Sequence, residues 1–242
     1  MRNLCTLRPN APSMSSPTSP NTSPLTIEIW SDVLCPFCYI GMREFEQALS
    51  RFEHKDQVMI EWKSFELDPN APVRSEEDTY TMLARKYGMT REEAKARSAG
   101  VAERAASLGL QFNMDKAVIA NSFDAHRLIQ YAKSHGLGDA AEERLFNAYF
   151  TDGVCISDHN ELVTLGTELG LDTEAVRAML ASDACSEAVR NDEYEAQQFG
   201  IRGVPFFAID RKFAVSGAQS ADHFLGALQH AWRERSTAAA NT

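Results

Sequence analysis

The chain has 242 residues, of which 44% are hydrophobic and 24% charged, and its formal net charge is −10. This length and composition are typical of a globular protein with a core of ordinary size, which needs neither metal nor disulfide staples. The acidic balance argues against non-specific binding to nucleic acid or to an anionic membrane surface, and no apolar stretch reaches the roughly 20 residues that span a bilayer.

Residues 1–24 are rich in Ser, Pro, Asn and Thr, and Arg2 and Arg8 are their only charged residues. They lack the apolar core of a secretory signal, so we interpret them as a disordered N-terminal tail. An organelle transit peptide is the alternative, because the segment contains no acidic residue. Met14 is a second candidate start.

From Leu25 the sequence predicts a strand, a helix and a second strand. Residues 26–30 alternate like a half-buried strand, residues 41–52 have helical spacing, and residues 58–65 alternate again. Two prolines in residues 68–72 then break the pattern. Residues 25–72 are therefore expected to form a βαβ unit, the first part of an α/β domain.

From about residue 75 to residue 199 nearly every segment has helical spacing, and we expect about six helices and no strand. Thr90 and Glu93 have the spacing of a capping box. The helical block is assigned to residues 73–188. Four glycines are placed to end its helices and the one that follows, namely Gly109, Gly136, Gly170 and Gly200.

The pattern returns to strands after Gly203. Residues 204–210 and 213–215 are short β-rich runs, and residues 220–232 have helical periodicity. We expect residues 189–235 to complete the α/β domain as an αββα segment, followed by a flexible tail at 236–242. This order indicates a helical block inserted into a small α/β domain.

Cys35-Pro36-Phe37-Cys38 lies where the first strand gives way to the first helix. Two thiols at this spacing can share a disulfide or give up its electrons. At the helix start, unpaired amides and the helix dipole stabilise a thiolate, and proline suits the first helical position because it has no amide. We therefore expect Cys35 to be the nucleophile and Cys38, one turn further in, to be the resolving thiol.

A structural zinc site is the alternative for this pair, because such sites use the same spacing. Zinc would need two further ligands, and the obvious candidates are Cys155 and His159. Nothing in the sequence brings them back to the first pair, so we expect no metal.

The five cysteines include a single close pair, which favours a reducing, cytoplasmic setting over a secreted disulfide scaffold. Cys185 shares a helical face with Val189 and Ala196, so we expect it to pack in the core. Cys155 lies in an expected loop, where a reactive thiol is an open alternative. Cys5 lies in the tail.

The helical block lies between two short motifs. Cys35-Pro36-Phe37-Cys38 precedes it, and Gly203-Val204-Pro205 follows it, just before the third strand. In this arrangement the chain resembles the thioredoxin superfamily. The insertion is similar to that of DsbA-like oxidoreductases, so the expected fold is a thioredoxin fold with an inserted all-helical domain. The resemblance covers roughly residues 25–233. Further segments are similar to the cytoplasmic FrnE branch, namely Ser31-Asp32, Tyr39-Ile40-Gly41, Ala120-Asn121-Ser122, Ala125-His126 and residues 200–207.

The resemblance implies roles for particular residues. Cys35 and Cys38 match the redox pair, and Pro205 matches a cis-proline that packs against it. The backbone of Val204 would then pair with a substrate peptide, as in a short β-addition.

Pro36 and Phe37 would also contact the substrate. The same two residues are where the chain departs from the DsbA pattern. This dipeptide lacks the histidine of strongly oxidising DsbA proteins and resembles a glutaredoxin pair, so we expect a less oxidising couple. No cysteine follows Cys185, which excludes a relay through a second, C-terminal pair.

Three polar residues are weaker candidates for proton transfer or for lining the cleft. Asp32 precedes the nucleophile by three residues and would either move protons or only cap the turn. Asn121 and His126 could line the cleft, but we favour the alternative of a helix cap and a histidine with satisfied hydrogen bonds.

The expected function is thiol–disulfide exchange with protein, peptide or small-molecule disulfides, with glutathione as a candidate co-substrate and no bound cofactor. The alternative is a glutathione-dependent isomerase or transferase, similar to 2-hydroxychromene-2-carboxylate isomerases or kappa-class transferases. Those proteins generally hold a serine at the position of Cys35 and lack the second thiol. A peptide-binding module without turnover is a third hypothesis. The sequence predicts no oligomeric state.

Overall fold

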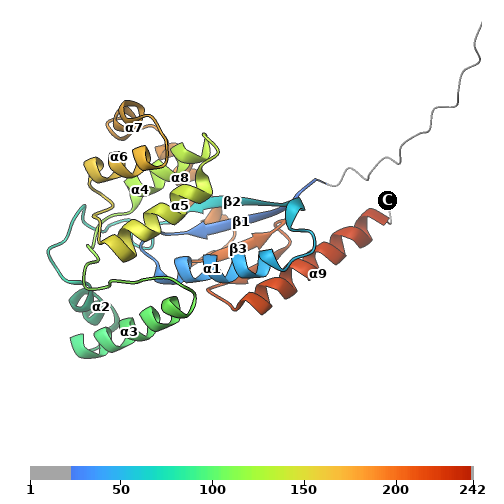
Figure 1. The fold of residues 1–242 in the computed structure, drawn as a ribbon, viewed down its shortest axis with the longest axis horizontal. Helices are drawn as coiled ribbons and strands as arrows, with labels where there is room; N and C mark the ends of the chain where they lie inside the picture. Colours follow the sequence, from blue (N-terminus) through green and yellow to red (C-terminus); the bar gives the residue numbers. More distant parts are fainter. Residues whose placement is uncertain (1–22, 241–242) are drawn as a thin grey trace, which may run out of the picture.

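The computed structural model describes residues 23–240, and a four-stranded sheet of order β2-β1-β3-β4 lies at its centre (Figure 1). The strands are β1 (Leu25–Ser31), β2 (Val58–Ser64), β3 (Phe206–Ile209) and β4 (Phe213–Ser216). β1 pairs in parallel with β2 and antiparallel with β3, and β3 pairs antiparallel with β4. The first strand is thus held between strands from both ends of the chain. The expected N-terminal tail lies outside the described residues, except for residues 23 and 24.

Helices cover both faces of this sheet. α1 (Pro36–Ser50) and α9 (Ala221–Ala240) pack against each other on one face, and α8 (Ser186–Gln198) packs on β2 from the other side (Figure 1). The alternation in β1 explains this, because successive side chains of a strand point to opposite faces. Ile29 joins the core that contains Phe45 of α1, whereas Trp30 packs with Ala196 of α8.

The helical block lies toward the end of the sheet to which β1 points (Figure 1). A 3₁₀ turn at Lys55–Gln57 precedes β2. The block contains α2 (Thr79–Tyr87), α3 (Arg91–Ser107), α4 (Phe123–Lys133), α5 (Gly138–Asn147), a π-helical turn (Ala148–Asp152), α6 (His159–Glu168) and α7 (Thr173–Leu180).

Counting α8, seven α-helices lie between residues 75 and 199, one more than expected. Gly88 and Gly153 also have positive φ and end further helical segments, which the sequence analysis did not anticipate. The capping box of Thr90 and Glu93 is confirmed, and the four expected glycine stops all have positive φ.

Some element boundaries differ from the expected ones. α8 begins at Ser186, so the boundary drawn between residues 188 and 189 falls inside this helix. β3 begins at Phe206, because Pro205 before it has no amide to donate to the sheet. α9 continues to Ala240, past the residue where we expected a flexible tail to begin. Among residues 23–240, no helix combines the length and hydropathy of a membrane span. The fold class, a thioredoxin fold with an inserted helical block, is confirmed.

Candidate functional site

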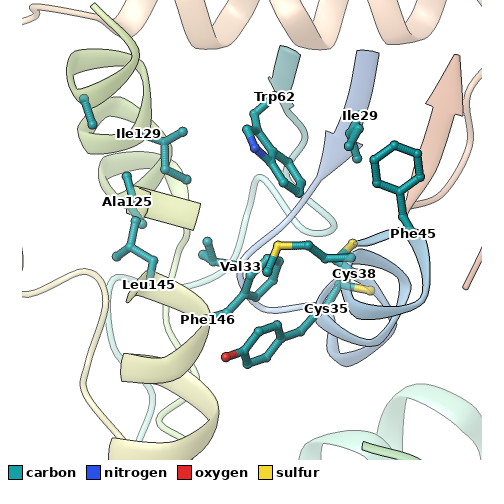
Figure 2. Packing of buried hydrophobic residues seen from close by; sticks show 14 of the residues in the cluster. Ile29, Val33, Cys35, Cys38, Phe45, Trp62, Ala125, Ile129, Leu145 and Phe146 are labelled. Carbon is teal, nitrogen blue, oxygen red and sulfur yellow. The ribbon is translucent and has the colours of Figure 1, made fainter. Parts of the chain in front are cut away.

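Cys35 and Cys38 lie at the start of α1 as free thiols (Figure 2). Cys35 is the N-cap residue with an extended backbone, and Pro36 opens the helix, as expected. The amide of Cys35 donates to the Asp32 carbonyl at 2.9 Å, and the amide of Cys38 donates to the Cys35 carbonyl at 3.0 Å. The chain therefore turns tightly before the helix begins, and it buries both side chains, which are 4% and 2% exposed.

The structure brings Val204 and Pro205 to this pair from the far end of the sequence. The Cys35 thiol donates to the Val204 carbonyl, with 3.6 Å between sulfur and oxygen. The Val204–Pro205 peptide bond is cis. The Pro205 ring lies so close to α1 that a Cβ at Gly41 would be 3.0 Å from its Cγ. A glycine in the first turns of α1 thus permits the close approach of the two segments.

A surface hollow of about 410 Å³ lies beside Val204 and Pro205. Residues 200–206 line it together with Ser216 and Gly217. The Val204 amide, on this loop, donates to no acceptor among residues 23–240. Phe37, between the two thiols in sequence, is 42% exposed and therefore available to a partner. The predicted substrate-contacting residues thus lie around one thiol.

Asp32 is completely buried and supports the turn that carries the motif. Its Oδ1 accepts the Leu34 amide at 3.1 Å, and its Oδ2 accepts the Leu67 amide at 2.7 Å. These bonds agree with the turn-capping interpretation. They also join the loop after β1 to the segment after β2.

Asn121 and His126 have different surroundings. Asn121 Oδ1 accepts the Phe123 amide at 2.8 Å, which supports the start of α4 as the helix-cap interpretation predicts. His126 is 0% exposed, which argues against the less favoured interpretation that it lines a cleft. The preferred alternative, a histidine with satisfied hydrogen bonds, is wrong, because neither ring nitrogen has a hydrogen-bond partner in the described part of the chain.

Cys38 has a more enclosed environment than Cys35. Burial raises the pKa of the Cys38 thiol well above its ordinary value, and the neighbouring Cys35 raises it further. The backbone of Asp32 and the hydroxyl of Ser31 lie close enough to lower the pKa, but they offset only part of the increase. Cys38 is therefore protonated at neutral pH.

Sequence reasoning missed two residues near the site, Glu142 and Tyr149. Both are buried, at 1% and 6% exposure. Together with Leu145 and Phe146 they have the i, i+3, i+4, i+7 spacing of a buried helical face. This spacing is the signal that could have placed a carboxyl group inside the protein.

Cys155 and Cys185 do not join the site, and Cys5 lies outside the described residues. Cys155 lies in a loop, as expected, with its sulfur 3.4 Å from Ser157 Oγ. Its proposed zinc-binding partner His159 pairs instead with Asp124 at 2.8 Å. Cys185 caps α8 and packs at the edge of the core.

Solved structures with this architecture include one close relative. A probable DsbA oxidoreductase from Streptomyces coelicolor is 42% identical to the chain, and the two structures align with a TM-score of 0.84. The alignment covers 87% of this chain and 91% of the relative. The likeness thus extends through the sheet and the helical block.

Two further structures share the fold at lower identity. The cytosolic disulfide reductase DsbM of Pseudomonas aeruginosa, solved with glutathione, is 21% identical with a TM-score of 0.61 over 86% of this chain and 100% of that one. A 2-hydroxychromene-2-carboxylate isomerase is 18% identical with a TM-score of 0.61 over 90% of this chain and 99% of that one. At these identities the likeness concerns the fold alone.

The sequence itself matches one protein family over most of its length. The match covers residues 26–229, from β1 into α9, and so includes all four strands and the whole helical block. The Cys35-to-Cys38 motif and the cis Val204–Pro205 bond both lie inside it. The chain therefore belongs to the DSBA-like thioredoxin domain family.

Proposed function

We propose that the protein is a thiol–disulfide oxidoreductase in which Cys35 attacks and Cys38 resolves. The observation that carries the proposal is the placement of both thiols at the N-terminus of α1, with Cys35 3.6 Å from the carbonyl of Val204. The N-terminus of a helix favours a thiolate, and the loop of Val204 offers a substrate backbone a place to pair.

The exchange requires two displacements. The Cys35 thiolate attacks one sulfur of the substrate disulfide, forms a mixed disulfide, and releases the other substrate sulfur as a thiolate. The Cys38 thiol then loses its proton and attacks Cys35 Sγ, which closes the Cys35–Cys38 disulfide and releases the second substrate thiolate. The substrate gains two electrons and the pair loses them. The reverse sequence oxidises a dithiol substrate.

The surroundings of Cys35 support peptide or protein disulfides as substrates. Phe37 offers exposed apolar surface, and the Val204 amide is free of acceptors among residues 23–240. We propose glutathione as the co-substrate that restores the pair and the cytoplasm as the compartment, on the basis of the single close cysteine pair. The Pro36-Phe37 dipeptide supports a moderately oxidising couple.

Cysteine variants test this function. Reduced wild-type protein is expected to turn over insulin or oxidised glutathione, and Cys35→Ser to lose this activity. Cys38→Ser is expected to accumulate a mixed disulfide that mass spectrometry detects. Cys185→Ser, outside the site, is the matched control and should keep full turnover.

The outcomes separate the competing functions. Full turnover in Cys35→Ser would contradict the proposal. Glutathione-dependent turnover that survives Cys38→Ser would instead support an isomerase or transferase. Equal suppression of aggregation by the wild type and by a variant lacking both thiols, without turnover in either, would support a peptide-binding module.

A further inference from the structure

The surface hollow beside the redox pair contains a single charged side chain, and the exchange described above gives it no role. Residues 200–206, Ser216 and Gly217 line this hollow, and Arg202 is the only charged residue among them. The volume of about 410 Å³ falls within the range of ligand-binding clefts. Apart from Ser216, the other lining side chains are apolar or absent.

The hollow lies at the end of the sheet that carries Cys35. β3 begins at Phe206, which pairs with Trp30 near the end of β1, and the motif follows β1 directly. The carbonyl oxygen of Val204 is 3.6 Å from the Cys35 sulfur. Arg202 precedes Val204 by two residues, a length of chain that spans at most about 7 Å. The residues next to a cysteine bound at Cys35 are therefore within reach of the Arg202 side chain.

The guanidinium of Arg202 is exposed and has no ion pair among residues 23–240. Arg190 and Arg211, the arginines before and after it in the sequence, each pair with two carboxylates. The whole chain has 34 acidic and 24 basic residues, so carboxylates are available for pairing in excess. The fold nevertheless leaves a positive charge beside Cys35 that a ligand can neutralise.

The backbone next to this side chain also presents free donors. The Ile201 amide donates to the Ala196 carbonyl at 2.9 Å. The amides of the next three residues, Arg202, Gly203 and Val204, donate to no acceptor in the part of the chain that the structure describes. Consecutive backbone amides bind anions, and a guanidinium beside them adds two parallel donors that match a carboxylate. The loop thus combines a charge and several donors for one anionic group.

Charges elsewhere in the molecule do not favour an acidic substrate. The formal net charge is −10, so the molecule as a whole repels anions. Phe37, the exposed side chain of the motif, is apolar and adds no charge. A preference for acidic substrates can therefore come only from a local cation such as Arg202.

We propose that Arg202 selects disulfide substrates that carry a carboxylate within about two residues of the attacked cysteine, an inference that rests on the proposed exchange. The substrate backbone pairs with Val204, and the carboxylate enters the hollow. There it accepts from the Arg202 guanidinium and from the amides of Arg202 and Gly203. The carboxylate comes either from an acidic side chain of a protein substrate or from the C-terminus of a small thiol peptide such as glutathione. Arg202 is thus a specificity-determining residue.

Matched peptide disulfides test this selection. The substrates are the symmetric disulfides of acetyl-Gly-Cys-Glu amide and of acetyl-Gly-Cys-Gln amide, which have nearly the same shape and differ in charge. Reduced protein is mixed with each disulfide, quenched with acid and alkylated, and mass spectrometry gives the rate constant for the loss of its thiols. The ratio of the two rate constants, divided by the same ratio for dithiothreitol, is the preference of the protein. In the wild type we expect a preference of roughly fivefold for the Glu peptide.

Substitutions of Arg202 should change this ratio and not only the rates. Arg202→Gln is expected to abolish the preference, Arg202→Lys to keep part of it, and Arg202→Glu to move it to the corresponding Lys peptide. A substitution that only loosens the loop would slow the reaction with both peptides alike.

Arg233→Gln is the matched control. Arg233 of α9 is also exposed, has no ion pair within the described residues, and does not line the hollow. The control changes the net charge by the same amount as Arg202→Gln and should keep the wild-type preference. Loss of the preference in both variants would attribute it to net charge and overturn the inference.

A second pair of probes distinguishes the source of the carboxylate. The disulfide of acetyl-Gly-Cys-Gly is offered with a free C-terminus and as the amide. A preference confined to the free C-terminus, and lost in Arg202→Gln, assigns the hollow to small thiol peptides. A preference confined to the Glu side chain, and lost in the same variant, assigns it to acidic segments of protein substrates.

The remaining outcomes separate this inference from the proposed exchange. Equal rates within both pairs of probes in the wild type, or a preference that Arg202→Gln leaves unchanged, would overturn the selection by Arg202 while leaving the exchange intact. Failure of the wild type to lose its thiols with any of these disulfides would instead contradict the exchange itself.

Discussion

Cys35 and Cys38 are both almost inaccessible, yet their neighbours differ in a way that matters for exchange. Cys35 meets the carbonyl of Val204 next to an open hollow, whereas Cys38 faces Ser31 inside the protein. Phe37 is the only exposed side chain of the motif. A bulky disulfide can therefore approach Cys35 from the side of Val204, while Cys38 is reached only from within the site. This asymmetry supports the proposed order of attack and resolution.

Glu142 gives a prediction for stability at the residue scale. Its pKa rises from an ordinary value of 4.5 to about 7 in the folded protein, so folding favours the protonated form. That contribution to the free energy of unfolding is complete below pH 4.5 and is lost as the pH rises to 7. Relative to Glu142→Gln, the wild type should lose about 2–3 kcal/mol between pH 5 and pH 8. Urea unfolding of both proteins at the two pH values measures this, and an equal difference at both would contradict it.

The sequence could identify the residues of the site whose chemistry is local. Cys35, Cys38 and Pro205 lie in short motifs, and the residue types and spacing of these motifs are enough to predict a redox pair and a proline beside it. Glu142 stands in no such motif. His126 belongs to a short segment that resembles the family, but only the packing of α4 against the loop of Asp32 shows that its imidazole is buried beside that carboxylate. When such side chains are buried close together, each changes the pKa of the other. The order of residue types along the sequence does not reveal which side chains the tertiary packing brings together.

At the scale of single elements, glycine marks the ends of several helical segments, but it does so for different reasons. Gly109 has a φ of +80° after α3, and a Cβ there would touch nothing within 4 Å. Gly153 has a φ of +75° after the π-helical turn, and a Cβ there would lie 2.6 Å from Lys116 Cβ and 2.8 Å from the Lys116 carbonyl oxygen. Only the second position also requires glycine for space.

Alanine substitutions at these two positions separate backbone strain from crowding. Gly109→Ala should cost about 1 kcal/mol, because only the left-handed conformation is disfavoured. Gly153→Ala should cost roughly 1–3 kcal/mol more, because backbone atoms of Lys116 must also move. Thermal or urea unfolding of both variants measures the difference. Equal losses would mean that the Lys116 segment moves freely away.

The elements themselves were largely predictable, and the differences have local causes. The first strand, the capping box at Thr90 and the glycine stops follow from spacing and turn chemistry. The capping box at Thr90 marked the start of α3, but the stop at Gly88, three residues before Arg91, was not predicted for the short helix α2. The start of α8 at Ser186 was missed because Cys185, the N-cap residue before it, has a positive φ, which is rare outside glycine.

At the scale of the molecule, Asp192 of α8 connects the sheet to the helical block. Its Oδ2 accepts the amide of Ser64 at 2.9 Å and the Gln130 side chain of α4 at 2.6 Å. Its Oδ1 is 3.3 Å from Lys63 Nζ. Its carbonyl accepts the Trp30 indole at 3.0 Å. One buried residue thus ties β1, β2, α4 and α8 together.

Removing this carboxylate should weaken the whole molecule. Asp192→Ala removes the acceptor of the Ser64 amide and of the Gln130 side chain, while Lys63 keeps Glu61 and Glu195, so we expect a loss of roughly 2–3 kcal/mol in the free energy of unfolding. Asp222→Ala is the control, since its pair with Arg51 is exposed and is worth less than about 1 kcal/mol. Urea unfolding followed by tryptophan fluorescence and by circular dichroism should give one transition for each protein. A loss in Asp192→Ala no larger than the control's would contradict this role.

The position of β1 in the middle of the sheet has a consequence for how the protein is made. Once β1, α1 and β2 of a nascent chain have emerged from the ribosome, both thiols are present. The second edge of β1 remains unpaired until Phe206–Ile209 also emerge. Val204 and Pro205 emerge at the same time. The proposed exchange site is thus assembled only after most of the chain has been synthesised. Until then, the open strand edge beside two thiols favours aggregation and mispaired disulfides. Rapid translation of the helical block would shorten the time during which this edge is exposed.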